Sequence, residues 1–393
     1  MADIHYLKLV SYTKIALLVI GIVFVSLSSQ AQTNKKPGTP KPILQDAKVM
    51  AQVKVVMDLI NGHDFTKSAR ELATLRRMVP EHPIADLLDG LTDYWQYYPV
   101  YADELKAKNY RTKLNACHDK SALMLDADAN SIEGTFFSMM TDMMLAKHYS
   151  DRGESVTAIN YTRKSFGYIK RGFELKAKYV EFYFTTGLYD YFRIAFPEKN
   201  PVMRSFMWMF PDGDKIRGLQ ELEVAFSKST FTRADAAVFL TRIYLYFENN
   251  PVKAVYYSGS ISNEYPTNPH YVLGYAESLL AAKRYQEALP LIQKLQAMPE
   301  EYYTTAGLIM LGWYYELSEK DMAKANFCYV KGTELAKKQK GRLYDNLKGI
   351  ALIGLARSWH QNLETKRAYA YYQRAAKLVA YPDLKREAEN FRP

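Results

Sequence analysis

Apolar residues recur at intervals of three and four positions along almost the whole chain from Ile43 onward. The stretches with this spacing run for about 12 to 18 residues, the length of an ordinary helix in a globular protein. Short polar breaks separate them, among them VPEHP, NNP and EYPTNP, which carry the proline and asparagine typical of turns. The strict alternation of apolar and polar residues that predicts a strand is almost missing. The pattern therefore predicts an all-α chain of many short helices.

One arrangement of three positions returns at a nearly regular interval. A small or apolar residue is followed four positions later, and again three positions after that, by further small or apolar residues. The trios are Gly218, Leu222 and Ala225; Ala254, Ser258 and Ile261; Ala288, Ile292 and Leu295; Ala325, Tyr329 and Gly332; and Ala368, Tyr372 and Ala375. Weaker copies lie upstream, at Ser68, Leu72 and Leu75 and at Ala158, Thr162 and Ser165. The five strong copies begin 36, 34, 37 and 43 residues apart, which predicts a repeat architecture.

The helices between these trios carry a second recurring feature, a large residue followed by a small one. It is found at Tyr275 and Ala276, at Leu311 and Gly312, and at Leu355 and Ala356. The period, the trios and these pairs together resemble the tetratricopeptide repeat family, whose unit has 34 residues. The resemblance implies an α-solenoid of about eight antiparallel helical hairpins, degenerate over residues 43–195 and regular over residues 215–393. Arg242 stands where the upstream copy of the pair would have its small residue.

The segment KRYQEALPLIQKL, residues 283–295, has the composition of a helix but contains Pro290. A proline deep inside a helix removes a hydrogen bond and costs roughly 3 kcal/mol. In the register of the repeat family, the second helix of this unit begins near Tyr285. We therefore expect Pro290 to fall just past the first turn, where little of the hydrogen-bond ladder is lost.

The interval from Ala158 to Gly218 is 60 residues, which is too long for one repeat. It contains FPEKNPVMRSFMWMFPDGD, residues 196–214, a proline-bounded insertion rich in methionine and aromatic residues. We interpret it as a short element that covers the groove of the repeats. A segment that touches a partner or a membrane is the alternative.

The first residues have the order of charges and apolar residues found in a secretory signal. Lys8 and Lys14 precede an apolar run at residues 15–27, and small residues follow at Ser29 and Ala31. We expect residues 1–31 to be a signal peptide cleaved after Ala31, and residues 32–42 to be a flexible linker. The product would be periplasmic or extracellular, with peripheral association with the cell envelope left open. An uncleaved membrane anchor is the alternative, although the run is short for a bilayer.

The chain has a net charge of +10 and contains 32 tyrosines. Its basic residues are scattered rather than gathered into one arm, so we interpret them as solvated helix faces and expect no nucleic-acid partner. Cys117 and Cys328 are the only cysteines. Two cysteines cannot hold together a fold of this size, and we expect both to be unpaired thiols.

The sequence contains no strong motif for enzyme chemistry. DADAN, residues 126–130, resembles the start of a calcium loop, but Ser131 and Phe137 stand where such a loop needs glycine and a carboxylate. Cys117 and His118 are adjacent but lack the second pair that a zinc site requires. Metalloprotease, nucleophile-elbow and phosphate-loop motifs do not occur. We therefore expect no enzyme activity, metal or cofactor, while a hydrolase with dispersed carboxylates, which needs no motif, stays open.

The resemblance also implies where a partner would bind. In the repeat family, first-helix residues just after the small residue line the concave groove, and residues one turn further on join them. These positions are Glu277, Trp313 and Arg357, joined by Tyr246, Glu316 and His360. We expect an exported, non-enzymatic scaffold that binds a protein or peptide through an aromatic residue flanked by opposite charges. A glycan- or nutrient-binding envelope protein is the alternative; the sequence names neither the partner nor the oligomeric state.

Overall fold

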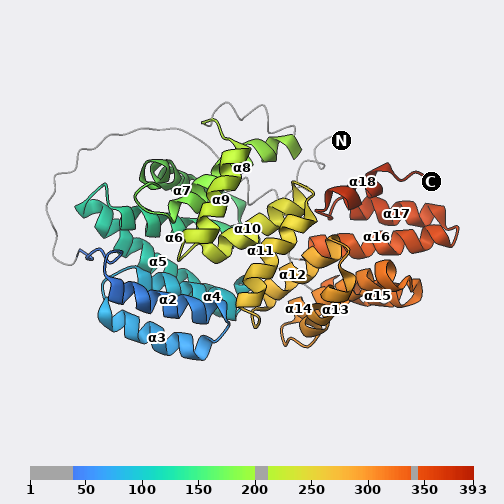
Figure 1. Ribbon diagram of the computed structural model, residues 1–393, viewed down its shortest axis with the longest axis horizontal. Coiled ribbons are helices and arrows are strands. Elements are labelled where there is room, and N and C mark those ends of the chain that lie inside the picture. Colours follow the sequence, from blue (N-terminus) through green and yellow to red (C-terminus); the bar gives the residue numbers. More distant parts are fainter. Residues whose placement is uncertain (1–38, 200–210, 338–343) are drawn as a thin grey trace. The chain divides into compact units, whose positions relative to one another are not determined.

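The computed structural model describes residues 39–199, 211–337 and 344–393 (Figure 1). Within these ranges the chain forms helices and turns and contains no strand, so the all-α prediction is confirmed. The expected signal peptide, the start of the linker and residues 200–210 of the insertion lie outside the described residues. None of the described helices is long and apolar enough to cross a membrane.

The chain divides into two compact units between Ala236 and Ala237, inside helix α10. The N-terminal unit contains α2 (Ala47–Asn61), α3 (Phe65–Met78), α4 (Ile84–Gln96), α5 (Glu104–Ala127), α6 (Ile132–Asp151), α7 (Ser155–Leu175), α8 (Phe182–Lys199) and α9 (Lys215–Lys228). From α10 (Arg233–Tyr246) the C-terminal unit continues with α11 (Pro251–Glu264), α12 (Pro269–Ala281), α13 (Tyr285–Gln296), α14 (Glu301–Tyr314), α15 (Met322–Lys337), α16 (Asp345–Gln361), α17 (Thr365–Ala375) and α18 (Pro382–Asn390).

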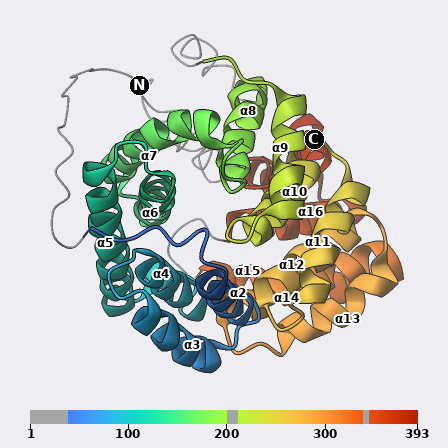
Figure 2. The ribbon, with the colours of Figure 1, turned by 60° about the vertical axis from the view of Figure 1, so that its left-hand side comes forward.

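Helices that follow one another along the chain pack against each other within each unit. The N-terminal unit has this packing from α2 to α9, and the C-terminal unit has it from α11 to α18. Figures 1 and 2 show these runs of neighbouring helices in two views. Helices two places apart in the chain are also in contact, for example α12 with α14 and α14 with α16. This packing is consistent with an α-solenoid, in which each unit contacts chiefly its neighbours.

The seven trios predicted from the sequence are all buried, and each lies on a different odd-numbered helix. They belong to α3, α7, α9, α11, α13, α15 and α17. The three large-then-small pairs lie on the even-numbered helices α12, α14 and α16. From α11 to α17, helices that carry a trio therefore alternate with helices that carry a pair, as the spacing predicted.

Tyr329 on α15 shows how a large residue in a trio is used. Its ring is completely buried and lies against Gly312 of α14 and Gly354 of α16. A Cβ added at Gly354 would lie 2.0 Å from Cε2 of Tyr329, and one added at Gly312 would lie 2.8 Å from Cδ1. Both positions need glycine because the tyrosine fills the space between successive helices.

The polar breaks in the sequence are helix starts. Asn250 and Asn268 are the N-caps of α11 and α12, and the side chain of each accepts backbone N–H groups of the first turn. Pro251 and Pro269 follow at the first helical position, where a missing N–H costs nothing. The Asn-Pro pair therefore ends the loop before each of these helices: asparagine caps the helix and proline is its first residue.

Helix α13 begins at Tyr285, as expected from the repeat register. Its inward trio of Ala288, Ile292 and Leu295 is fully buried, whereas Pro290 lies on the exposed side. The proline removes one hydrogen bond, to the carbonyl of Gln286, where water can replace it. Pro290 is the sixth of the twelve residues of α13, further into the helix than expected, and the helix tolerates it because the lost hydrogen bond is on the exposed side.

Two buried glutamates in the N-terminal unit hold distant backbone segments. Glu133 accepts the N–H groups of Ile43 and Leu44, both at 2.8 Å, and Nε2 of His82 at 2.7 Å. Glu181 accepts N–H groups at the start of α10, including that of Thr232 at 2.8 Å, and the hydroxyl of Thr232 at 2.7 Å. Burial raises the pKa of Glu181, and these hydrogen bonds oppose the rise. Both carboxylates satisfy backbone donors that would otherwise be buried without acceptors.

Both cysteines are buried free thiols, so the expectation that they are unpaired is confirmed. Cys117 accepts a hydrogen bond from the hydroxyl of Thr141 at 3.2 Å. Burial raises the pKa of the Cys117 thiol to about 12, which makes it inert at neutral pH.

Candidate functional site

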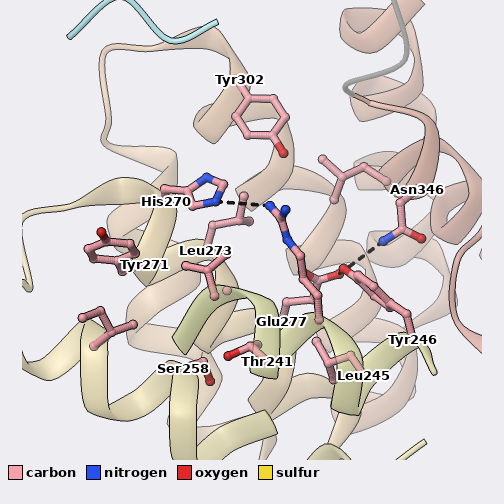
Figure 3. Close-up of a pocket in the computed structure, with 15 residues that line it drawn as sticks. Thr241, Leu245, Tyr246, Ser258, His270, Tyr271, Leu273, Glu277, Tyr302 and Asn346 are labelled. Atoms are coloured by element: carbon pink, nitrogen blue, oxygen red, sulfur yellow. Dashed lines mark hydrogen bonds between the residues drawn. The ribbon is translucent and has the colours of Figure 1, made fainter. Parts of the chain in front are cut away.

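A small cavity lies among the helices of the C-terminal unit (Figure 3). Its volume is about 70 Å³. The even-numbered helices supply most of its polar lining: Thr241, Arg242 and Tyr246 from α10, His270 and Glu277 from α12, Tyr302 from α14 and Asn346 from α16, with Ser258 added from α11. Leucines such as Leu245 and Leu273 complete the wall. Four helices thus place polar side chains around one space.

Arg242 gives the cavity its positive charge. Its Nη2 lies 3.3 Å from Nε2 of His270, a contact drawn as a dashed line in Figure 3. Because a guanidinium can only donate, Nε2 of His270 is the acceptor in this contact. The hydroxyl of Tyr302 points into the same space from α14 (Figure 3). This side of the cavity therefore presents hydrogen-bond donors.

Glu277 gives the cavity its negative charge. One oxygen of its carboxylate accepts the hydroxyl of Tyr246 at 2.8 Å and the amide of Asn346 at 3.2 Å. Burial raises the pKa of Glu277 above its usual value, and a hydrogen bond with Tyr381, these two hydrogen bonds and the charge of Arg242 work against the rise. The cavity therefore carries opposite charges on residues of neighbouring helices, which suits a polar group with both donor and acceptor atoms.

The six residues predicted to bind a partner all lie in the C-terminal unit, but they do not share one open surface. Tyr246 and Glu277 line the cavity. Trp313 is only 5% exposed, and its ring lies 5.5 Å from that of Tyr381. His360 is exposed, with its ring 5.1 Å from that of Phe391. Two of these four therefore line the cavity, and the other two contact aromatic residues near the end of the C-terminal unit.

Arg357 and Glu316, the remaining two, belong to one ion-pair network. Arg357 donates through Nη1 to Glu316 at 2.7 Å, and through Nε and Nη2 to the two oxygens of Glu387. Tyr329 and Tyr372 complete the network by donating to Glu316 at 2.6 Å and to Glu387 at 2.8 Å. Burial would raise the pKa of Glu387, but the hydrogen bonds and charge of Arg357 hold it below its usual value.

The sequence did not identify four of the polar residues that line the cavity: Arg242, His270, Tyr302 and Asn346. Only Arg242 carried a signal, since it interrupts the large-then-small pattern of the even-numbered helices. An arginine needs space beside it when it stands where the other helices have a small residue. The cavity provides that space. The other three are ordinary residues in a repeat sequence, brought together only by the fold.

An unusual acid lies elsewhere, on α6 of the N-terminal unit. The side chain of Asp142 is completely buried, and neither carboxyl oxygen has a hydrogen-bond partner among the described residues. The nearest ring nitrogen, Nε2 of His118, is 3.8 Å from Oδ1. Burial raises the pKa of Asp142 to about 7, while burial also lowers the pKa of His118. The pair is therefore a buried acid beside an imidazole that favours its neutral form.

The described residues hold no group of three or more histidine, cysteine, aspartate or glutamate side chains placed to bind a metal ion. The DADAN segment forms the turn between α5 and α6, where Asp128 accepts the N–H of Asn130 at 2.8 Å. This side chain is used to close the turn.

No protein-family model matches the chain, and no curated protein is significantly similar to it. The assignment of function therefore rests on the residues themselves.

Proposed function

We propose that the chain is an exported, non-enzymatic scaffold of the tetratricopeptide type, with about eight helical hairpins, that binds a protein or peptide partner. The binding site is the cavity formed by α10, α12, α14 and α16, with the neighbouring residues of the same helices around it. The observation that carries this proposal is the convergence of Arg242, Tyr302 and Glu277 from three helices on one small space. Convergent polar groups in a concave space are a common mark of a binding site.

The size of the cavity favours a side chain over a free metabolite. A water molecule needs roughly 10–15 Å³ of cavity volume, counted as the space open to the centre of a water-sized sphere. A cavity of about 70 Å³ therefore holds a handful of waters, or one side-chain head group. A partner that inserts one side chain here must bind with the rest of its surface elsewhere, as a peptide or protein does.

The charges favour a carboxylate or carboxamide as the inserted group. Arg242 and Tyr302 offer donors to its oxygen, and Glu277 offers an acceptor to an N–H beside it. The lining of this cavity includes a single carboxylate, Glu277. Acid–base hydrolysis by a carboxylate pair needs two, so binding is better supported here than the dispersed hydrolase.

Selection from a random twelve-residue peptide library displayed on phage tests the proposal. The purified chain is expected to enrich peptides that carry an acidic or amide side chain, and Arg242→Gln is expected to lose that enrichment. Arg284→Gln is the matched control, because Arg284 is about half exposed and pairs with Glu287 on the surface. Failure to enrich any peptide class, or the same enrichment by Arg242→Gln, would refute the proposal.

A further inference from the structure

The end of the chain lies across the residues that were predicted to bind a partner. After α17 the backbone passes close to α16: the N–H of Ala380 donates to Oδ1 of Asn346 at 2.8 Å. A Cβ added at Gly349 would lie 2.6 Å from the nitrogen of Val379, so the two backbones are in direct contact. Residues 381–391, which include α18, follow; we call them the C-terminal segment.

Tyr381 anchors the beginning of this segment. Its ring lies 5.2 Å from that of Tyr246 on α10 and 5.5 Å from that of Trp313 on α14, edge to face in both cases. The tyrosine is 6% exposed. Edge-to-face contacts of this kind are specific in geometry as well as favourable. One aromatic side chain therefore joins helices α10 and α14.

Glu387 anchors the middle of the segment through a two-pronged ion pair. Nε and Nη2 of Arg357 donate to its two oxygens at 2.8 and 2.5 Å, and the hydroxyl of Tyr372 donates to it at 2.8 Å. Arginine and carboxylate in this arrangement form one of the strongest polar contacts in proteins.

Phe391 anchors the end. Its ring lies 4.6 Å from that of Tyr372 and 5.1 Å from that of His360. The three anchors together contact four of the six residues predicted to bind a partner, namely Tyr246, Trp313, Arg357 and His360. The fifth, Glu316, is bound to Arg357.

Between the anchors the segment adds little to the core. Only Ala388 is buried among the nine residues of α18. A helix of this length is marginal in water by itself, so it depends on its anchors. The segment is held by a few side chains, with exposed residues between them, so it resembles a bound peptide more than a core helix. Segments held by so few contacts detach from the fold most readily.

On the basis of the proposed function, we propose that this face binds a partner helix that replaces the C-terminal segment. The partner presents an aromatic residue just before its helix, a carboxylate within the helix six positions later, and a second aromatic just after the helix, as Tyr381, Glu387 and Phe391 do around α18. The chain's own segment occupies the face until such a helix displaces it. Because the segment is tethered, it competes at a high effective concentration, and weakening it strengthens partner binding.

A fluorescent peptide with the sequence VAYPDLKREAENFRP, residues 379–393, is the probe. Its affinity is measured by fluorescence anisotropy for the full chain and for Tyr381→Ala combined with Glu387→Gln. We expect the double variant to bind the probe at least about tenfold more tightly than wild type. Glu389→Gln, an exposed position on the same helix, is the control and should bind as wild type does. A probe with alanine for its tyrosine and phenylalanine and glutamine for the central glutamate should not bind.

Circular dichroism and tryptophan fluorescence check that the variants are folded. Should the double variant unfold, Glu387→Gln alone, which keeps the side-chain volume, is expected to bind the probe about threefold more tightly than wild type. Equal affinity of wild type and the folded variants, or no binding to either, would overturn the inference. A wild-type dimer in light scattering that dissociates in the variants would also overturn it, because the segment would then join two copies.

These outcomes are separable from failure of the proposed function. Peptide selection through Arg242 does not require the C-terminal segment to leave. If that selection succeeds while the probe fails, the cavity binds a partner and only the displacement of the segment is wrong. If selection fails as well, the proposed function is also wrong.

Discussion

Asp142→Asn is expected to stabilise the N-terminal unit at pH 8 and to leave its stability almost unchanged at pH 4. The folded state raises the pKa of Asp142 from 3.8 to about 7 because the carboxyl is buried without a hydrogen-bond partner among the described residues. The folded state therefore binds the proton more tightly than the unfolded state. It follows that the stability is greatest below about pH 4 and decreases as the pH rises to about 7.

The magnitude follows from the size of the shift. A difference of roughly 3 pKa units, at about 1.4 kcal/mol per unit, corresponds to at most about 4 kcal/mol lost once the carboxyl of Asp142 ionises. Asparagine has nearly the same shape and no charge, but its amide also lacks partners and retains part of the burial cost. We therefore expect a gain of about 2–4 kcal/mol at pH 8.

Hydrogen exchange of peptides from α6 and α7, measured by mass spectrometry at both pH values, reports the stability of the N-terminal unit alone. The expected result is slower exchange in Asp142→Asn than in wild type at pH 8 alone. Asp119→Asn is the control: Asp119 also lies near His118, at 3.9 Å, but is 84% exposed, so its substitution should change nothing. Faster exchange in Asp142→Asn at pH 8 would refute the reasoning, because it would mean that Asp142 is charged and paired with protonated His118.

Three further substitutions test the packing. Ala288→Leu should lower the free energy of unfolding by roughly 1–3 kcal/mol, because Ala288 is completely buried between helices. The melting temperature by circular dichroism measures the loss, and an unchanged value would mean that the repeat register is wrong. Gly354→Ala should cost a similar amount by colliding with the ring of Tyr329, and a melting temperature equal to that of wild type would contradict this contact. Glu181→Gln should cost roughly 1–3 kcal/mol in urea unfolding, because its amide would face the N–H of Thr232; no loss would argue against that hydrogen bond.

The helices and their inward faces could be predicted from the sequence because both depend on local spacing. A trio such as Ala288, Ile292 and Leu295 lies within two turns of one helix, so its burial follows from the period alone. The start of α13 at Tyr285 followed from the register of the repeat family that the sequence resembles.

The candidate site could be predicted only in part, because it depends on contacts between residues far apart in the chain. Tyr246 and Glu277 are separated by 31 positions and Glu277 and Asn346 by 69, and no local pattern reveals that they meet. The position of α18 was hidden for a different reason. Its sequence, PDLKREAEN, has almost no apolar face, so nothing in it predicted that it would pack on Arg357.

The hydrogen bonds of Glu133 have a consequence for folding during synthesis. In an array of helices that contact their neighbours, each pair can fold soon after it is made. The backbone of Ile43, however, finds its acceptor 90 residues further along the chain. At synthesis rates of about 5–20 residues per second, Ile43 waits on the order of ten seconds for Glu133 of α6. Until then Ile43 and Leu44, which precede α2, have no carboxylate to accept their N–H groups, so their position is fixed only after the helices that follow them are made.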